Sequence, residues 1–290
     1  MKKILFATTA LVATASVAAA DVSFSGYGRF GVRYDGGLSS TDITSRLRLQ
    51  IDATAESDSG VTFGARIRIQ QDNTSFGAAN SPRFFARSGG LEVGVGNIYG
   101  AFESMPGQYS IDMGLTGLGY ESVAYRYGAD YYQSGLTSAP LNGVEVMYSA
   151  GDFQGHISHS QNSGPSGNDR TALYGAYTFS GWTVALGYQD SDTTDTEFTA
   201  TVSGNIGPAA VALGYGKSYA GDDRIVLSGR FDVGASTNIE AYIADDSAAA
   251  NKSYGIDFNH DLGGGTSIRG GVVSNYAGDT IADLGVRFNF

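Results

Sequence analysis

Beyond residue 20, the chain is built from short segments in which apolar and polar side chains alternate. In residues 61–70 one set of alternate positions is Val, Phe, Ala, Ile and Ile, and the other is Thr, Gly, Arg, Arg and Gln. A period of two places successive side chains on opposite faces of a β-strand. The same pattern recurs in residues 22–34, 44–53, 182–189, 209–216, 225–233, 254–262 and 284–290. The sequence therefore predicts an all-β protein whose strands each have one apolar and one polar face.

The connections between these segments have two lengths, which alternate along the chain. We expect tight turns at residues 56–60, 88–90, 150–152, 180–181, 205–208, 234–236 and 263–265. We expect longer polar connections at residues 35–41, 71–81, 161–169, 190–197, 218–223, 245–251 and 275–280. Short turns at one end and longer loops at the other are typical of β-barrels that span a bacterial outer membrane.

Residues 98–142 interrupt this pattern. The segment is rich in Gly and carries the carboxylates Glu103, Asp112, Glu121 and Asp130. A loop this long inside a compact domain is usually functional. Residues 123–127 could form a strand, but leaving them in the loop preserves the alternation of turn lengths and gives sixteen strands, an even number. We therefore predict a 16-stranded antiparallel transmembrane β-barrel over residues 21–290, with residues 98–142 folded into the lumen as a constriction loop.

A soluble β-sandwich is the alternative fold, because it also alternates apolar and polar side chains. A sandwich, however, does not need short turns at one end only. The chain also stops on an alternating strand that places Leu284, Val286, Phe288 and Phe290 on one face. Both features favour the barrel.

The first twenty residues have the features of a secretory signal peptide. Lys2 and Lys3 precede an apolar segment, and small residues end at Ala20, where we expect cleavage. An uncleaved N-terminal anchor is the alternative. The chain has no Cys, which excludes a disulfide framework. Its formal net charge of −11, which becomes more negative without the two lysines, argues against a nucleic-acid partner.

Assigning the polar faces to the lumen brings basic residues of neighbouring strands together. If the last strand pairs with the first, eight arginines share five adjacent strands: Arg29, Arg33, Arg46, Arg48, Arg66, Arg68, Arg269 and Arg287. The predicted basic wall of a pore constriction is the set near strand centres: Arg29, Arg46, Arg48 and Arg66. The predicted acidic face, on the loop, is Glu103, Asp112 and Glu121. Water in the pore keeps such charges ionised. The alternative is that the arginines only solvate the lumen or bind wall carboxylates such as Asp52.

Several segments resemble the general-diffusion porins of Rhodobacter-type Gram-negative bacteria. The opening strands do so at residues 26–31 (GYGRFG), 45–49 (SRLRL) and 60–66 (GVTFGAR). Residues 95–97 (VGN) followed by 101–104 (AFES) are similar to the start of that family's long third loop, and residues 281–290 to its last strand. Between residues 104 and 279 only the alternation carries the similarity.

The resemblance implies a homotrimeric outer-membrane porin with its third loop folded inward, in contact with membrane lipid and lipopolysaccharide. Small hydrophilic solutes and ions would pass through it passively. By motif, the family's constriction residues fall on Arg29, Arg46, Arg48, Arg66 and Glu103. Asp112, Glu121 and Asp130 follow only from their position in the loop. No cofactor is required, although the resemblance implies that Glu103 and Asp112 are optional ligands of a calcium ion.

Two other functions are open: a substrate-selective outer-membrane channel, and an outer-membrane enzyme built on a barrel. An enzyme of that kind needs a convergent Ser/His or Asp/His set. Alternation places His156 on the lumen side and His159 on the other, so these residues do not converge. We therefore expect a channel and not an enzyme.

Overall fold

The computed structural model describes residues 20–290, except 74, 126–127, 135–141, 162–167 and 194–195. Apart from Ala20, the expected signal peptide lies outside the described residues. The strands are β1 (Asp21–Asp35), β2 (Ser40–Glu56), β3 (Thr62–Asp72), β4 (Ser75–Ala79), β5 (Arg83–Ser88), β6 (Leu91–Gly96), β7 (Asn142–Ala150), β8 (Phe153–Gln161), β9 (Arg170–Phe179), β10 (Trp182–Ser191), β11 (Glu197–Ile206), β12 (Ala209–Lys217), β13 (Asp223–Asp232), β14 (Thr237–Asp246), β15 (Ser253–Gly263), β16 (Thr266–Ser274) and β17 (Thr280–Asn289). In the described part of the chain, no helix is long and apolar enough to cross a membrane.

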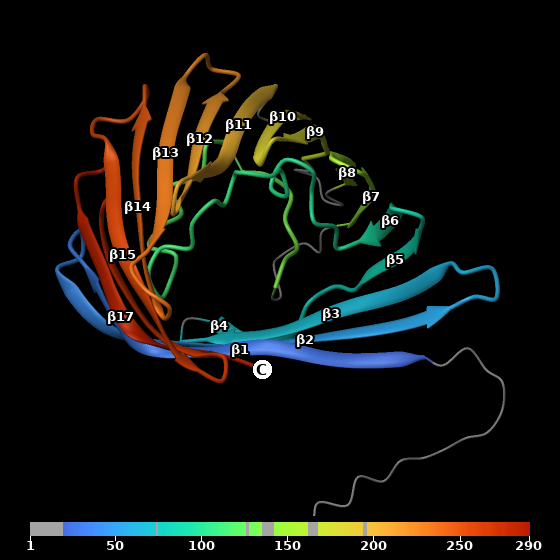
Figure 1. The fold of residues 1–290 in the computed structure, drawn as a ribbon, viewed down its shortest axis with the longest axis horizontal. Helices are drawn as coiled ribbons and strands as arrows, with labels where there is room; N and C mark the ends of the chain where they lie inside the picture. The colour runs from blue at the N-terminus through green and yellow to red at the C-terminus, as the bar shows by residue number, and fades with distance from the viewer. Residues whose placement is uncertain (1–19, 74, 126–127, 135–141, 162–167, 194–195) are drawn as a thin grey trace, which may run out of the picture.

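All the strands belong to one antiparallel sheet that closes on itself (Figure 1). β4 and β5 both pair with β3, so they form two halves of one barrel strand, interrupted at residues 80–82. Pro82 lies at the interruption and has no N–H group to donate to the ladder. Pairing of β1 with β17 completes the ring. The barrel therefore has sixteen strands, as predicted.

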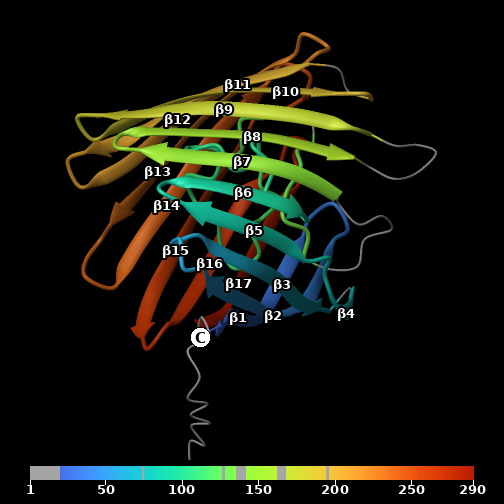
Figure 2. The ribbon, with the colours of Figure 1, turned by 90° about the vertical axis from the view of Figure 1, so that its right-hand side faces the viewer.

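The turn pattern is largely as predicted, with two corrections. In Figure 2 the tight turns lie at the left-hand end and most longer connections at the right-hand end. The expected longer connection at 35–41 is a short turn of residues 36–39, because β1 and β2 stay paired as far as Asp35 and Ser40. The expected connection at 71–81 contains β4, because β3 continues to Asp72 and Ser75 pairs back onto it.

The long connection also falls where the sequence placed it. It runs from the end of β6 at Gly96 to the start of β7 at Asn142. Residues 123–125 form no strand, in agreement with their assignment to the loop, and residues 126–127 lie outside the described residues.

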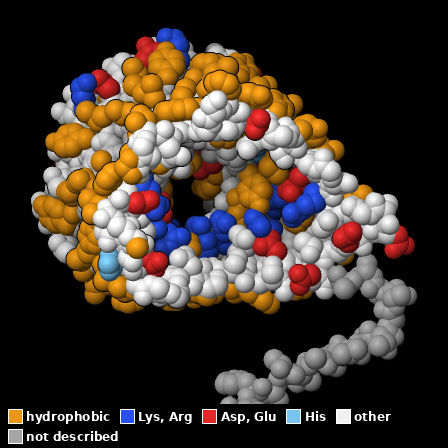
Figure 3. All heavy atoms as spheres, in the orientation of Figure 1, with side chains coloured by type: hydrophobic (Ala, Val, Ile, Leu, Met, Phe, Trp, Pro, Cys, Tyr) orange, Lys and Arg blue, Asp and Glu red, His pale blue; other side chains and the backbone are white. Residues whose placement is uncertain are grey.

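The two faces of each strand have the environments that alternation predicts. On β10 the outward Leu186 is 52% exposed, whereas the neighbouring Ala185, which faces the lumen, is fully buried. The outer surface is covered with hydrophobic side chains, visible in Figure 3. Exposed apolar side chains in a continuous belt are expected where a barrel is surrounded by lipid.

The seam between β1 and β17 depends on two glycines of β1. The backbone groups of Gly26 and Phe290 exchange hydrogen bonds, with N···O distances of 2.8 and 3.0 Å. On the outer face, the ring of Phe288 lies over Gly28, where an added Cβ would come within 2.3 Å of the ring. The terminal aromatic residues thus cover a part of the ladder that has no side chains of its own.

Gly28→Val is expected to destabilise the barrel by about 1–3 kcal/mol, because the new side chain occupies the space of the Phe288 ring. The urea midpoint of the barrel refolded in phospholipid vesicles measures this effect. Gly175→Val is the matched control, since Gly175 pairs with the outward-facing Leu186 and a Cβ there would have nothing within 4 Å. Equal midpoints for the two variants would contradict this account of the seam.

Candidate pore constriction

The described part of the connection between β6 and β7 lies inside the barrel (Figure 1). We call its described residues, 97–125 and 128–134, the inner loop. It runs along the inner wall to a tip at residues 112–116 and then returns. From the start of the loop to its tip, its hydrogen-bond partners lie on wall strands further and further around the barrel: β7, β11, β13, β14, β15, β17 and finally β1.

The base of the inner loop is fixed by a buried carboxylate on β7. Glu145 accepts hydrogen bonds from the backbone N–H groups of Tyr99 (2.9 Å) and Gly100 (3.3 Å). Its other contacts are with Arg83 Nε (2.6 Å) and His156 Nε2 (3.0 Å). Because a paired, hydrogen-bonded charge is stable when buried and an unpaired one is not, this cluster fixes where the chain turns into the lumen.

The tip of the inner loop is held by three more buried carboxylates of the wall. The pairs are Asp112 N–H with Glu240 (2.9 Å), Gly114 N–H with Asp257, and the N–H groups of Leu115 (2.9 Å) and Thr116 (2.7 Å) with Asp283. Irregular backbone has no ladder partner, so its N–H groups need other acceptors when buried. Hydrogen bonds to a charged acceptor are among the stronger ones. The wall therefore holds the tip through its backbone.

Apolar contacts complete the attachment. Ile111, Met113 and Leu118 of the inner loop are buried in one cluster with Val226 and Val273 of the wall. The returning path is tied by Arg224 to the carbonyl oxygen of Tyr125 (3.0 Å) and by Arg170 to Asp130 (3.1 Å). The inner loop thus lies along most of the wall. It reaches β1 at its tip, through Arg29, and β3 near its two ends, through Arg66 and Arg68.

The eight arginines lie on β16, β17, β1, β2 and β3, which are adjacent in the sheet, as predicted. Arg29 stands directly opposite Arg287 on one side and Arg46 on the other. Figure 3 shows basic side chains gathered along one side of the central opening. We call these eight residues the arginine arc.

Each predicted basic-wall residue has a contact within the barrel. Arg29 donates to the carbonyl oxygen of Leu115 (2.7 Å), Arg46 pairs with Asp72 (3.3 Å), Arg48 donates to Gln70 (2.7 Å), and Arg66 contacts Asp52 (2.5 Å) and the hydroxyl of Tyr99. Binding to wall carboxylates, which the sequence left open as the alternative, therefore applies to Arg46 and Arg66.

Of the three predicted acidic residues, Asp112 is the one that forms ion pairs with the arginine arc in the described part of the chain. The Asp112 side chain, 53% exposed, pairs with Arg269 (2.7 Å) and Arg287 (3.1 Å). These partners belong to the arc but not to the four residues predicted as its constriction wall.

Glu103 and Glu121, the other two predicted acidic residues, have their described contacts outside the arginine arc. Glu103 accepts hydrogen bonds from the hydroxyls of Tyr109 (2.8 Å) and Tyr125, and in the described part of the chain it pairs with no arginine. Burial raises the pKa of the Glu103 carboxyl, and the two tyrosine hydroxyls act in the opposite direction. Glu121 lies on the returning path and accepts the N–H of Tyr276 (3.1 Å), beyond the end of β16. The positions of these two carboxylates depend on other side chains of the loop and on the path of the loop through the barrel. Alternation along the strands predicts neither.

The same geometry does not fit calcium at Glu103 and Asp112. Their carboxylates lie in different surroundings, one between tyrosine hydroxyls and the other between two guanidinium groups. The described residues contain no group of three acidic or His side chains that could hold a metal ion. Calcium needs several oxygen ligands around one point.

Sequence reasoning missed the aromatic side chains of the inner loop and the acids beneath it. Tyr109 and Tyr120 are 42% and 49% exposed and lie edge to face, with ring centroids 6.2 Å apart. The signal for the acids was present: Glu145, Asp257 and Asp283 sit on the lumen side of strands. Their role was not predictable, because it depends on which loop atoms lie opposite.

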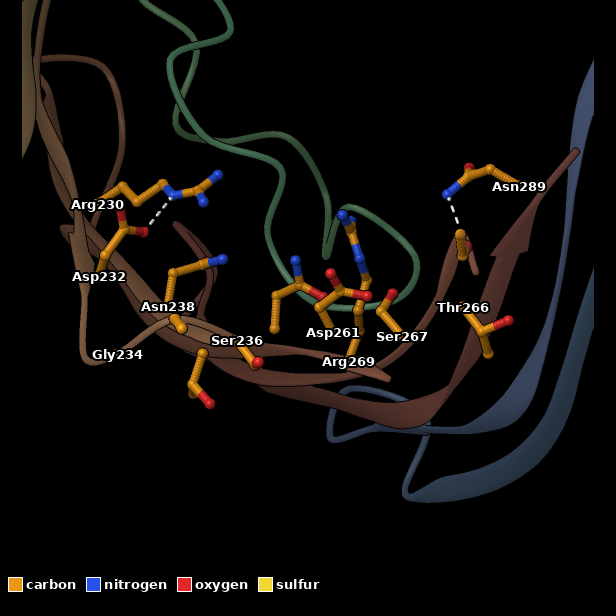
Figure 4. A pocket seen from close by; sticks show the side chains of 14 residues that line it. Arg230, Asp232, Gly234, Ser236, Asn238, Asp261, Thr266, Ser267, Arg269 and Asn289 are labelled. Carbon is orange, nitrogen blue, oxygen red and sulfur yellow. Dashed lines mark hydrogen bonds and ion pairs between the residues drawn. The ribbon is translucent and has the colours of Figure 1, made fainter. Parts of the chain in front are cut away.

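The lumen is also polar toward the end with the tight turns. A hollow of about 380 Å³ lies there (Figure 4), lined by residues that include Arg230, Asp232, Asp261, Arg269 and Asn289. Arg269 belongs both to this hollow and to the contact with Asp112. The polar lining thus continues from the tip of the inner loop toward that opening.

Comparison with known proteins agrees with this architecture. A family model described as Gram-negative porin matches residues 7–280. Proteins named Porin from Fuscovulum blasticum and Rhodobacter capsulatus are 34% and 30% identical, each covering 93% of this chain and 100% of the relative.

Solved structures agree as well. Two mutants of Rh. blastica porin match with TM-scores of 0.82 and 0.80 at 28% and 30% identity, over 93% of this chain and 100% of theirs. The similarity in sequence and in fold extends over most of the chain, which therefore belongs to the Gram-negative porin family and is a general-diffusion channel of the outer membrane.

Proposed function

We propose that the inner loop and the arginine arc form the narrowest section of the channel and limit the size of the solutes that pass. The observation that carries this proposal is the attachment of the loop's backbone to Glu145, Glu240, Asp257 and Asp283. A loop held along the wall fills part of the bore and leaves a fixed opening. Small hydrophilic solutes and ions would diffuse through that opening, with polar side chains replacing part of their hydration.

We also infer that the barrel has no catalytic activity. The ring of His156 is engaged by the buried Glu145, while His159 contacts Thr171 (2.9 Å) and His260 contacts Thr237 (2.7 Å). Each histidine thus has a separate partner, on different strands. A nucleophile, a base and an orienting group must lie within reach of one another, and these contacts do not favour such a set.

We propose that the channel assembles as a homotrimer in contact with lipid and lipopolysaccharide. Support comes from small outward-facing residues on β2 and β3, where Ala53 stands directly opposite Ala65 and both are partly buried. Small side chains allow close approach of packed membrane elements. The arginine arc lines the inside of these same strands, so the open side of the constriction would face the trimer centre.

Asp283→Ala is expected to loosen the tip of the inner loop and to raise the single-channel conductance and its fluctuations. The substitution leaves the N–H groups of Leu115 and Thr116 without their acceptor, at a cost of roughly 1–3 kcal/mol for each group that stays buried. Single-channel recording in planar bilayers measures both quantities. Asp152→Ala, in an exposed tight turn, is the control and should behave as the wild type. A folded Asp283→Ala barrel with unchanged current and noise would refute the proposed role of the tip.

Ala53→Phe is expected to weaken the trimer while the barrel stays folded, because a large side chain prevents close packing at β2 and β3. Migration on gels without heating and cross-linking in native membranes report the number of chains. Ala200→Phe is the control, since Ala200 on β11 also faces outward and stands opposite Leu186 on β10. A wild-type monomer under gentle extraction, or equal trimer yield from both variants, would argue against the proposed interface.

A further inference from the structure

The open side of the constriction carries more positive than negative charge. Arg33 lies near the end of β1 and is left aside. The other seven arginines of the arc are Arg29, Arg46, Arg48, Arg66, Arg68, Arg269 and Arg287. The carboxylates that pair with them in the described part of the chain are Asp52, Asp72 and Asp112. The remaining wall acids of this section are buried and bind the backbone of the inner loop. A chain with a formal net charge of −11 therefore has a basic constriction.

In the part of the chain that the structure describes, three of the seven arginines have uncharged partners alone. Arg48 donates to the side-chain oxygen of Gln70 (2.7 Å), Arg68 donates to Ser134 (2.7 Å) and Gln50 (3.0 Å), and Arg29 donates to the carbonyl oxygen of Leu115 (2.7 Å). Uncharged acceptors orient a guanidinium group without neutralising it. The positive charge of these residues thus remains to act on ions in the lumen.

A tyrosine limits the movement of two members of the arc. The guanidinium carbons of Arg287 and Arg48 lie 4.4 and 5.1 Å from the centroid of the Tyr27 ring. Tyr27 stands opposite Arg48 in the ladder, and Arg29, two residues along β1, stands opposite Arg287. The cation–π contacts hold like charges near one another, and a group held in place loses less entropy when it binds a ligand.

We propose that the constriction, as part of the pore proposed above, selects anions over cations. We further propose that Arg29, Arg48 and Arg287 form a weak site for small oxyanions, that is, carboxylates and phosphates. A planar guanidinium group donates two parallel hydrogen bonds to such ligands, which chloride cannot accept in the same way. Rings of Arg and Lys are a recognised means of selecting anions and phosphate in pores.

Because salt screens distant charges, the potential that an ion meets in the constriction depends on the nearby arginines more than on the net charge of the chain. Acidic residues such as Asp58 and Asp245 are exposed on turns and at strand ends. Exposed charges act over a Debye length of about 8–10 Å at ordinary salt concentrations. An ion at the narrowest section lies beside the arginines, so they dominate the potential that it meets.

The test is the reversal potential of the purified channel in a planar bilayer with a KCl gradient. We expect chloride to be favoured over potassium. The double variant Arg48→Gln/Arg68→Gln should lower the permeability ratio by about threefold for each charge, the order expected for a charge roughly 7 Å from an ion in water. Arg48→Lys/Arg68→Lys should keep the preference. Arg87→Gln is the control, because Arg87 lies at the tight-turn end and pairs with Glu92 (3.6 Å).

Phosphate tests the oxyanion site. Adding inorganic phosphate should lower the chloride current of the wild type in a saturable manner and should affect Arg48→Gln much less. An open channel that prefers potassium would overturn the proposed selectivity while leaving the pore intact. A chloride current that phosphate does not alter would overturn the oxyanion site. A folded barrel without conductance would overturn the pore itself, and with it this inference.

Discussion

The structure depends on how a long irregular segment is accommodated inside a barrel. Its backbone N–H groups cannot join the ladder, and burying them without acceptors is unfavourable. Four buried carboxylates of the wall, Glu145, Glu240, Asp257 and Asp283, supply those acceptors. Because these acids come from strands spread around the barrel, they fix the path of the loop and not only its ends. The shape of the lumen is therefore set by interactions between wall side chains and loop backbone.

This attachment also explains the unequal distribution of charge in the lumen. Wall acids beneath the inner loop are turned toward its backbone. Among the acidic side chains of the loop, Glu103 binds two loop tyrosines, while Glu121 and Asp130 bind Tyr276 and Arg170 outside the arginine arc. The arginines of β1–β3 meet the inner loop through uncharged groups, the carbonyl oxygen of Leu115 and the hydroxyls of Tyr99 and Ser134. Among the described loop carboxylates, Asp112 is the one that pairs with the arc, at its edge, through Arg269 on β16 and Arg287 on β17.

Much of this architecture follows from periodicity. Alternation predicts which face of each strand meets the lumen, and closure of the first strand on the last predicts the arc of arginines. The even strand count, obtained by leaving residues 123–127 in the loop, agrees with the barrel. Periodicity does not report what lies across the lumen, so it did not predict the partners of Glu103 and Glu121, which are two tyrosine hydroxyls and the N–H of Tyr276. It also gave no indication that residues 75–79 pair with β3, because a strand of that length is hard to distinguish from a polar connection.

The inner loop is held in a fixed position along the wall by strands from β7 to β17. Ser110 of the loop and Ser228 of β13 have their hydroxyl oxygens 2.5 Å apart, and the chain has no cysteine of its own. We predict that Ser110→Cys/Ser228→Cys forms an intramolecular disulfide on mild oxidation of the folded barrel, detected by the loss of maleimide-reactive thiols and its return after reduction. Two thiols that stay reactive in the folded barrel, with no disulfide formed, would contradict the account.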